Sequence, residues 1–452
     1  MTRILALAAV WVLAGVATAL AAGPDCTQSS LSTTTLSETI TFDNGMQVPV
    51  GSSGTCAVTS TIVVPDGYYG VFRADSRVHS ELDTGDSATY SLTSNSQTGN
   101  ALVHGPSSDD LEFTHYYATG LASGPTAFTG DATIDASGVD PSFYGEYDSV
   151  DLLLAYTTKQ QQQDSIDLIG LQQLAISTHL DETATLLTGG DLPLEGANEF
   201  RVLGAVGSGT LGVTGRYNLA DGFSLLGGAS IVDFGVPGGN ASGVLAAGAA
   251  RFVQPGSDEF RLMGEAGVQA AGLGLSFSRH YEDGSTVGTD ATGSGFGVLA
   301  SVYAKGGVLW APDAYDAVLF AGTVKQGALG IGSFSEADSN ANPNLFAADF
   351  SNTAQNFTTV KVGADWTRKL TSNLDLTASL AAGAATGSGA TAEVFGIGTV
   401  NGHAQSTFFA EYGLRVGWDV AQGARADGFI AGSTGTNIGT HAQIGAGYSF
   451  SF

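Results

Sequence analysis

The last twelve residues of the chain alternate strictly between apolar and polar positions. The apolar set is Ala442, Ile444, Ala446, Tyr448, Phe450 and Phe452, and the residues between them are His, Gln, Gly and Ser. Because successive side chains of a strand point to opposite faces, this pattern predicts a β-strand with one apolar and one polar face. The apolar face of this strand ends on aromatic residues at the carboxyl terminus.

The same alternation recurs many times between residue 199 and the end of the chain. In the segment 260–270, Phe260, Leu262 and Val268 alternate with Arg261 and Glu265. The segments that carry it are 200–217, 223–232, 244–252, 260–270, 273–281, 296–310, 317–325, 357–367, 374–385, 406–420, 425–433 and 440–452. A soluble β-sandwich also alternates, but it does not repeat apolar faces of this length. These segments match the ~9–11 tilted residues that cross a bilayer as a strand, and we predict an even number of about 12 strands.

The connections between these segments are of two kinds. Long polar connections lie at 282–293, 332–355 and 387–405, whereas 219–222 and 369–373 are short. Outer-membrane barrels have longer extracellular loops and short periplasmic turns. We therefore expect the long connections at the cell surface and the short ones in the periplasm.

Residues 157–187 form the one segment with a convincing helical pattern. Its apolar positions recur at helical spacing and are Ile166, Ile169, Leu171, Leu174 and Leu180. The opposite side carries Gln, Ser, Thr, His and Asp. Gly189 and Gly190 follow and predict the end of the helix, because glycine is common just after a helix C-terminus.

Residues 23–156 predict a small all-β module. The segment is rich in Ser, Thr, Asp and Gly, with β-like runs at 57–64, 68–73 and 111–117. Asn44-Gly45 and Pro65-Asp66-Gly67 are turn signals, and polar stretches such as 93–100 are expected to be loops. We find no 20–30-residue period that would indicate a long β-helix.

The amino terminus predicts an export signal at residues 1–22. Arg3 is followed by an apolar stretch from Ile4 to Leu20, and Ala19-Leu20-Ala21 has the small-x-small pattern of a cleavage site. We expect cleavage near Ala21 or Ala22. After this signal, no apolar run approaches the ~18 residues that a transmembrane helix needs.

Composition supports a membrane barrel and argues against nucleic acid as a partner. Charged residues make up 13% of the chain and glycine accounts for 64 of 452 residues, against about 25% and about 7% in soluble domains. The formal net charge of −27 disfavours nucleic acid and anionic lipid head groups.

Cys26 and Cys56 are the only cysteines, and an even pair in an exported segment predicts a disulfide.

The last strand is similar to the closing strand of bacterial outer-membrane β-barrels. In that class a terminal Phe is also the signal that the barrel-assembly machinery reads, which implies this role for Tyr448, Phe450 and Phe452. The whole arrangement, with residues 1–22 as signal, 23–156 as passenger, 157–190 as linker and pore helix and 191–452 as barrel, resembles an autotransporter (type V secretion).

This resemblance implies a fold and a location. The fold is all-β, with a C-terminal transmembrane barrel of about 12 strands, a plug helix in the pore and a small all-β passenger before it. The protein would lie in the outer membrane as a monomeric barrel and display the passenger at the cell surface, in adhesion or another surface interaction. Its implied partners are outer-membrane lipid, the barrel-assembly machinery and periplasmic chaperones, with the surface ligand unknown.

Two departures from the family bear on the fate of the passenger. Many members with cleaved passengers carry an Asn-Asn pair in the pore helix, but residues 157–187 contain no Asn. This favours a tethered module. The passenger is also far shorter than is usual in the family.

Residues with potential chemistry in the passenger form no recognisable site. Gly85-Asp86-Ser87 resembles the opening of GDSL esterases, but no Asp-x-x-His follows it in the passenger, so we interpret it as a turn. The histidines His79, His104 and His115 lack metal-ligand spacing. Aspartates 131, 135 and 140 lack the calcium-loop order and are interpreted as solvated loop acids. We expect no enzyme, no catalytic residue, no cofactor and no metal.

Two other classes of function stay open. A diffusion porin with an amino-terminal periplasmic domain would also use a barrel, although general porins have ~16 strands and no plug helix. A surface hydrolase is disfavoured because the passenger shows no nucleophile and base pair.

Overall fold

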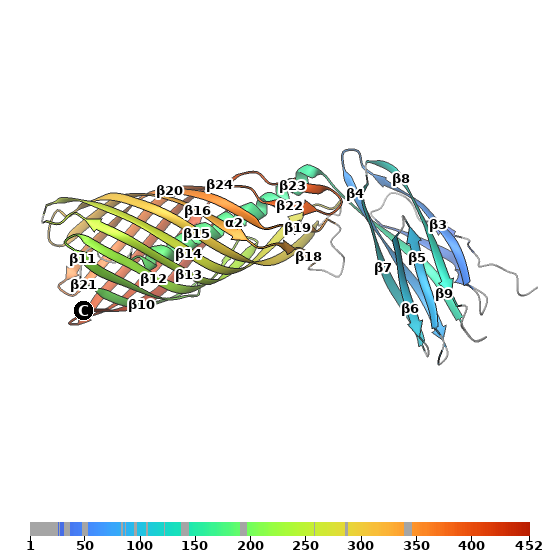
Figure 1. Ribbon diagram of the computed structural model, residues 1–452, viewed down its shortest axis with the longest axis horizontal. Helices are drawn as coiled ribbons and strands as arrows, with labels where there is room; N and C mark the ends of the chain where they lie inside the picture. Colours follow the sequence, from blue (N-terminus) through green and yellow to red (C-terminus); the bar gives the residue numbers. More distant parts are fainter. Residues whose placement is uncertain are drawn as a thin grey trace, which may run out of the picture. The chain divides into compact units, whose positions relative to one another are not determined.

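The computed structural model describes residues 26, 28–30, 37–47, 53–82, 85, 87–94, 97–104, 107–121, 123–136, 144–189, 197–256, 258–284, 288–338 and 346–452. The predicted signal at 1–22 lies outside these residues. The chain forms two compact units, one that contains the residues up to Lys159 and one that contains most of the remainder (Figure 1). In the described part of the chain, no helix combines the length and the apolar character needed to cross a membrane.

The amino-terminal unit contains two antiparallel sheets. One consists of β1 (Gln28–Ser30), β2 (Ser37–Gln47), β9 (Tyr144–Thr157), β4 (Tyr69–Leu82) and β7 (Ser107–Leu121) in that order. The other consists of β3 (Ser53–Val64), β8 (Gly124–Asp135), β5 (Ser87–Ser94) and β6 (Gln97–His104). Val58 and Ile134 of the second sheet share a buried core with Phe72 and Val150 of the first. The predicted small all-β module is therefore a β-sandwich.

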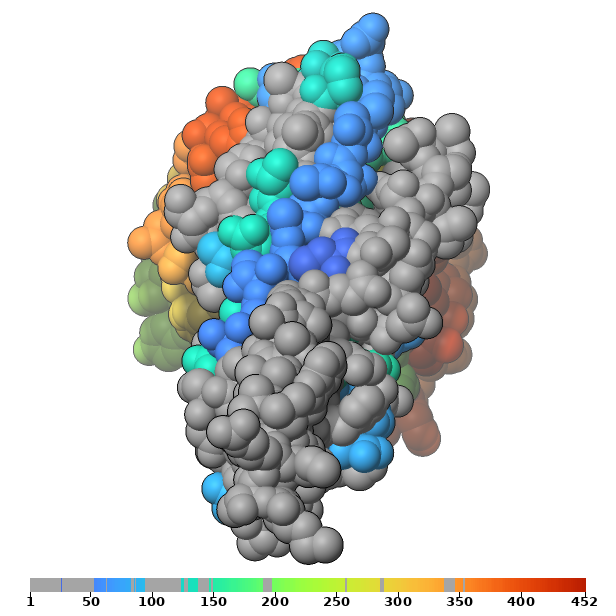
Figure 2. Space-filling model, turned by 90° about the vertical axis from the view of Figure 1, so that its right-hand side faces the viewer, coloured from blue at the N-terminus to red at the C-terminus, as the bar shows by residue number. Residues whose placement is uncertain are grey.

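The outer side of β3 and β8 is polar. Thr55, Thr59 and Thr61 are exposed on β3, while Cys56 and Val58 between them are buried. The Oγ1 atoms of Thr55 and Thr133 on β8 lie 2.9 Å apart. The described residues of β3 and β8, blue and teal in Figure 2, lie side by side on this face.

The predicted disulfide is present. Cys26 is bonded to Cys56, 30 residues later in the chain. Cys56 belongs to the core of the sandwich and is 1% exposed, whereas Cys26 is exposed. The bond therefore ties the start of the described chain to β3.

Of the two turns predicted in the module, one is present and the other is not. The amide of Tyr68 donates to the carbonyl of Pro65 at 3.1 Å and Gly67 has a φ of +83°, so the turn at 65–67 is confirmed. Asn44-Gly45 is not a turn: it lies inside β2, where the register with β9 shifts between Thr41 and Met46. Such an irregularity absorbs extra residues without ending the strand.

The described residues of the polar stretch 93–100, which are 93–94 and 97–100, are strand and not loop. They contain the end of β5 and the start of β6, and Thr93 pairs with Thr98. Threonine is β-branched and fits a solvent-facing strand, so its polarity does not mark a loop.

A single helix in the described chain, α2 (Lys159–Leu187), follows the sandwich. It ends where the sequence predicts. The amide of Thr188 donates to Ala184 O at 3.0 Å and that of Gly189 donates to Leu186 O at 3.1 Å. Gly189 has a φ of +63°, the left-handed conformation that closes helix C-termini. Gly190 lies outside the described residues.

The rest of the chain forms a closed antiparallel barrel of 12 strands (Figure 1). In pairing order the strands are β10 (Glu199–Val206), β11 (Thr210–Ala220), β12 (Phe223–Val236), β13 (Gly239–Val253), β14 (Phe260–Tyr281), β15 (Thr289–Trp310), β16 (Asp316–Ile331), β20 (Thr353–Thr371), β21 (Leu374–Gly387), β24 (Gln405–Ala421), β25 (Ala424–Gly435) and β26 (Gly439–Ser451). The last strand pairs with the first, with Phe450 opposite Phe200. Closure removes every open sheet edge, which a lipid environment requires.

The two faces of the barrel strands follow the predicted alternation. On β14, Leu262 is 61% and Val268 is 57% exposed, whereas Glu265 and Gln269 are buried. The apolar residues of β26 likewise point outward, and His441 and Gln443 point inward. An apolar outside and a polar inside are typical of an outer-membrane barrel.

Two errors in the predicted segments cancel in the strand count. The segment 200–217 is two strands, β10 and β11, joined by a turn at 207–209 in which Gly207 and Gly209 have positive φ. The segments 260–270 and 273–281 are one strand, β14. In both places the apolar residues change from even to odd positions. In β14 the reason is that Leu273, Leu275 and Phe277 face the interior.

The named connections fall at the two ends of the barrel as expected, although short turns such as 207–209 and 436–438 also lie at the end with the long connections. Because the strands alternate in direction, 282–288, 332–352 and 388–404 share one end, and 221–222, 372–373 and 422–423 share the other. The two longest connections contain strands of their own, β17 (Phe334–Ser335), β18 (Ala337–Asp338), β19 (Ala348–Phe350), β22 (Thr391–Val394) and β23 (Gly398–Asn401). Four of them, all but β18, form a small sheet at the end with the long connections.

Candidate functional site: the helix in the barrel lumen

The interior of the barrel holds α2 (Figure 1). Residues 172–184 of this helix are buried without interruption, although they include Gln, Ser, Thr, His, Asp and Glu. A helix with polar residues buried on all sides needs polar partners around it. The inward side chains of the strands supply them at three levels.

The first level lies at the end with the long connections. Arg279 of β14 donates to Gln162 Oε1 at 2.6 Å and to Ser165 Oγ at 3.0 Å. The same guanidinium pairs with Glu336, which lies between β17 and β18, at 2.6 Å. Asp167 lies 2.9 Å from His403 in another long connection. The amino-terminal half of α2 is thus fastened to the connections at this end.

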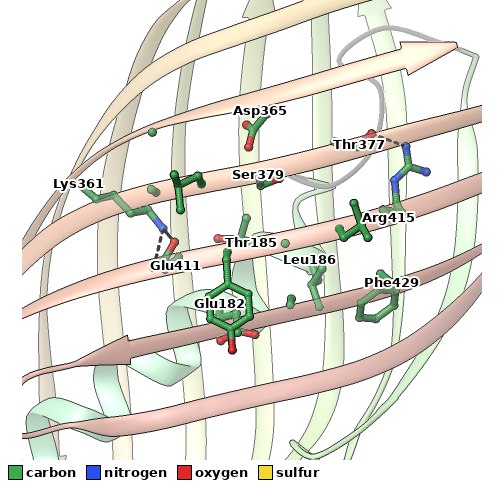
Figure 3. Close-up of a pocket in the computed structure, with 18 of the residues that line it drawn as sticks. Glu182, Thr185, Leu186, Lys361, Asp365, Thr377, Ser379, Glu411, Arg415 and Phe429 are labelled. Carbon is green, nitrogen blue, oxygen red and sulfur yellow. Dashed lines mark hydrogen bonds and ion pairs between the residues drawn. The ribbon is translucent and has the colours of Figure 1, made fainter.

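At the second level Asp181 meets two lysines of the barrel wall. Its Oδ1 lies 3.1 Å from Lys325 Nζ of β16, and its Oδ2 lies 3.0 Å from Lys361 Nζ of β20. Gln269 of β14 also donates to Oδ1 at 3.0 Å. Lys361 pairs in addition with Glu411 of β24 at 2.9 Å (Figure 3). Opposite charges compensate each other here in a region that water reaches poorly.

The next residue, Glu182, points to a different part of the wall. Its carboxylate accepts a hydrogen bond from Gln443 Nε2 at 2.7 Å and lies 3.2 Å from His441 Nδ1, both on β26. Gln443 in turn accepts from Ser208 of the β10–β11 turn at 2.6 Å. Glu182 therefore connects the helix to the seam at which the barrel closes.

The third level is the carboxyl end of α2. Thr214 of β11 donates to the carbonyl of Leu187, and Arg251 of β13 donates to the carbonyl of Thr188 at 3.2 Å. Arg251 also pairs with Glu265 at 2.6 Å. A cation at a helix C-terminus satisfies free carbonyls and interacts favourably with the helix dipole. The helix thus runs from the long connections toward the short turns.

A small cavity lies beside the helix. A cavity of about 130 Å³ lies between α2 and the wall formed by β20, β21, β24 and β25. Glu182, Thr185 and Leu186 border it from the helix, and Lys361, Glu411 and Arg415 border it from the strands (Figure 3). The charged groups at its border are hydrogen-bonding partners for water molecules in a cavity of this size.

The proposed assembly-signal residues lie on the outside of the barrel. Tyr448 is 39% and Phe450 is 50% exposed on β26, and their rings lie 4.9 Å apart. Phe452 follows the last residue of the strand, is 75% exposed, and its amide donates to Asn198 O at 3.0 Å. Their role in assembly stays a prediction.

The passenger candidates do not come together as a site in the described residues. Gly85 lies in a turn with a φ of +102° and Ser87 begins β5, while Asp86 lies outside the described part. His79 lies 3.6 Å from Glu81, and the side chains of His104 and His115 are not among those described.

The predicted loop position of the passenger aspartates is wrong for two of them. Asp131 and Asp135 lie on β8 and are exposed. They occupy the outward positions of the strand, because the alternate residues Ala132 and Ile134 are buried in the core. Asp140 lies outside the described residues.

Sequence reasoning missed the charges that hold the helix. Lys325 and Lys361 lie on the polar side of segments predicted to cross the membrane. A charged residue buried inside the barrel needs a partner of opposite charge, which is the signal that could have found them. The identity of the partner, Asp181, could not be predicted, because 180 residues separate it from Lys361.

No protein-family model and no curated protein match this chain. Among solved structures, the barrel is similar to the translocator domain of the autotransporter NalP from Neisseria meningitidis, with a TM-score of 0.41 and 16% identity over 62% of this chain and 99% of that one. It is similar to the β domain of the Bordetella autotransporter BrkA, with a TM-score of 0.36 and 13% identity over 57% and 99%. It is also similar to the monoaromatic hydrocarbon channel CymD, with a TM-score of 0.36 and 8% identity over 60% and 93%.

Structural similarities with TM-scores and sequence identities this low do not assign the chain to a family. The closed barrel of 12 antiparallel strands, apolar outside and polar inside, has the architecture of an outer-membrane β-barrel in its own right.

Proposed function

We propose that this protein is an autotransporter-type outer-membrane protein that carries its amino-terminal β-sandwich to the cell surface and keeps it there on α2. The observation that supports this most is the direction of the helix. Its start contacts the long connection 388–404 through Gln163 and Asp167, and its end contacts Thr214 and Arg251 near the short turns.

This direction determines where the preceding chain leaves the barrel. Residues before Lys159 exit the lumen at the end with the long connections, which face the outside of the cell in outer-membrane barrels. A module that stayed in the periplasm would enter the lumen from the other end. The chain therefore has to pass its sandwich, or its unfolded precursor, through the barrel during biogenesis. We expect barrel-assembly machinery and periplasmic chaperones to take part.

We propose further that the module stays attached. The helix contains no Asn, and its residues 172–184 are buried in the lumen, where we expect them to be protected from added protease. Tethering suits a module that acts by contact, in adhesion or surface protection, without enzymatic activity of its own. The module is strongly acidic, with 16 acidic residues against Arg73 and Arg77 between residues 23 and 150, so a cationic or neutral surface is the better match for it.

The test is the location of the module on intact cells. A tag inserted near Asp25 should be accessible to antibody without permeabilisation. The same tag in the turn at 372–373, between β20 and β21, should become accessible only after permeabilisation. The reverse result would place the module in the periplasm and overturn the proposal. A free fragment that corresponds to residues 23–156 in the medium would disprove tethering alone.

The alternative function is a channel with a periplasmic amino-terminal domain. That function requires an open lumen, whereas α2 lies along it and the cavity beside the helix has about 130 Å³. The conductance of the protein with and without α2 separates the two functions.

A further inference from the structure

Two histidines and a glutamate meet where α2 faces the closing strand of the barrel. His179 and Glu182 come from the helix, and His441 comes from β26. One ligand atom from each side chain lies within 4.8 Å of the other two. The imidazole rings of His179 and His441 are 4.9 Å apart.

Local structure explains why these side chains converge. His179 and Glu182 are three residues apart in α2, so they lie on one face of the helix. His441 occupies an inward position of β26. The alternate residues Ala442 and Ile444 are exposed on the outer face of the strand, so His441 and Gln443 point inward. His441 Nδ1 lies 3.2 Å from Glu182 Oε2.

The cluster is buried and polar. His179 is 3%, Glu182 is 7% and His441 is 8% exposed. Phe234 of β12 covers it, with ring centroids 6.0 Å from His179 and 6.2 Å from His441.

The two neighbouring carboxylates of α2 differ in how their charge is balanced. Asp181 lies between Lys325 and Lys361. Glu182 accepts hydrogen bonds from Gln443 and His441, and no Lys or Arg in the described chain forms an ion pair with it. A buried carboxylate beside two imidazoles lacks a cation of its own.

We propose that His179, Glu182 and His441 bind a divalent transition-metal ion of the Zn²⁺ type. Two imidazole nitrogens and one carboxylate oxygen are a common ligand set for zinc, with a water at the fourth position. Zinc binds nitrogen at about 2.0–2.1 Å, which places tetrahedral donors about 3.3 Å apart. His441 Nδ1 and Glu182 Oε2 already have this separation, and a ligand atom of His179 lies within 4.8 Å of the ligand atoms of the other two residues, so that a small shift of its side chain supplies the third donor.

The surroundings favour ligation. Ser433 Oγ of β25 lies 3.2 Å from His179 Nδ1, so that a hydrogen bond to one ring nitrogen orients the other, as is usual for metal-bound histidines. A bound ion would join the helix to β26, which also pairs with β10 to close the barrel. The metal would thereby hold the plug against the seam. This inference does not depend on where the amino-terminal module resides.

The experiment uses the full-length protein, extracted from outer membranes in detergent and purified without a polyhistidine tag. After treatment with a chelator, the protein is titrated with ZnCl₂ by calorimetry, and bound metal is counted by elemental analysis. We expect one Zn²⁺ per chain. Glu182→Gln, which can still accept from Gln443, and His441→Asn should each weaken binding by about 100-fold or more, since even second-shell losses cost 10–100-fold.

His403→Asn is the matched control. His403 also pairs with a helix carboxylate, Asp167 at 2.9 Å, but it is 61% exposed and belongs to no cluster of potential metal ligands in the described part of the chain. This variant should keep wild-type Zn²⁺ affinity. Heat-modifiable migration on gels verifies that every variant has folded.

Three outcomes would overturn the proposal. They are the absence of saturable binding by the wild type, unchanged affinity in both Glu182→Gln and His441→Asn, and an equal loss in His403→Asn. A second measurement needs no variant: Co²⁺ added to the wild-type protein should give the intense visible absorption of a tetrahedral nitrogen and oxygen site. A weak spectrum identical to that of free Co²⁺ would also refute the site.

Discussion

Lys361 of β20 donates a hydrogen bond to Asp181 of α2 at 3.0 Å, although 180 residues separate the two in sequence. Lys325 approaches the other oxygen of the same carboxylate at 3.1 Å. A single helix residue is therefore held by two strands of the wall. Because the carboxylate can occupy this position in one helix register only, the contact sets how far α2 extends through the lumen.

We predict that Asp181→Asn loosens the helix. The amide leaves Lys325 without an anion, while Lys361 keeps Glu411. Removing one partner of a buried ion pair costs about 3–5 kcal/mol, and the pair that is lost is buried, with the Lys325 side chain 1% and the Asp181 side chain 10% exposed. The midpoint of thermal unfolding, followed by heat-modifiable migration, should fall.

Asp164→Asn is the control for this substitution. Asp164 lies on the same helix but is exposed and bonds with Gln160 at 2.7 Å. Its substitution should leave the midpoint within the scatter of the wild type. Equal midpoints for the two variants would show that the lysines do not hold the helix.

We predict that deletion of residues 157–187 opens the barrel. The wild-type protein should show little conductance in planar bilayers, because α2 fills the lumen and the cavity beside it has about 130 Å³. The deletion should give large and steady channels. Val324→Ala, on the outer face of β16, should behave as the wild type. Stable large conductance of the wild type would favour the channel function over the autotransporter function.

We predict that the carboxyl terminus is needed for insertion. Removal of residues 448–452 takes away the partners of Phe200 and Val202 on β10, and an open edge does not survive in lipid. Phe452→Ser tests the assembly signal separately, because Phe452 lies beyond β26 and is 75% exposed. Both changes should abolish heat-modifiable migration while export to the periplasm continues.

Phe408→Ser is the matched control for Phe452→Ser. Phe408 of β24 is another outward aromatic residue and is 72% exposed. Its substitution should reduce insertion far less. Unchanged amounts of Phe452→Ser in the outer membrane would contradict the signal.

We predict that the disulfide stabilises the sandwich and not the barrel. Thiol labelling of the denatured, unreduced protein should detect no free cysteine. Cys26→Ser removes the bond at its exposed end and should lower the stability of the module by about 3–4 kcal/mol on the chain-entropy model for a loop of this size. Limited proteolysis should then cut the module faster, while the heat-modifiable behaviour of the barrel stays the same. Equal proteolysis rates for the two proteins would count against this role.

Much of the architecture follows from local pattern. The alternation in residues 442–452 requires one apolar and one polar face, because neighbouring side chains of a strand point in opposite directions. The end of α2 at Gly189 follows from the left-handed conformation that glycine adopts easily. The pairing of Cys26 with Cys56 follows from there being two cysteines. In each case a rule that acts over a few residues, or a simple count, suffices.

Tertiary structure decided what a pattern leaves ambiguous. The apolar residues change parity both between Val202 and Leu211 and between Val268 and Leu273. The first change is a turn, and the second is a continuous strand whose buried face switches to the interior. Whether an apolar residue faces lipid or packs inside depends on its surroundings in three dimensions.

The contacts between α2 and the barrel wall also depend on the tertiary structure. The spacing of polar residues in the sequence is enough to predict a polar side of α2 and polar inner faces of the strands. Only the closed barrel brought Asp181 to Lys361, and His441 to His179 and Glu182. These contacts join residues 180 or more positions apart, and no local propensity selects a partner at that distance. The barrel closure and the helix register select it, since they allow each inward side chain only a few neighbours.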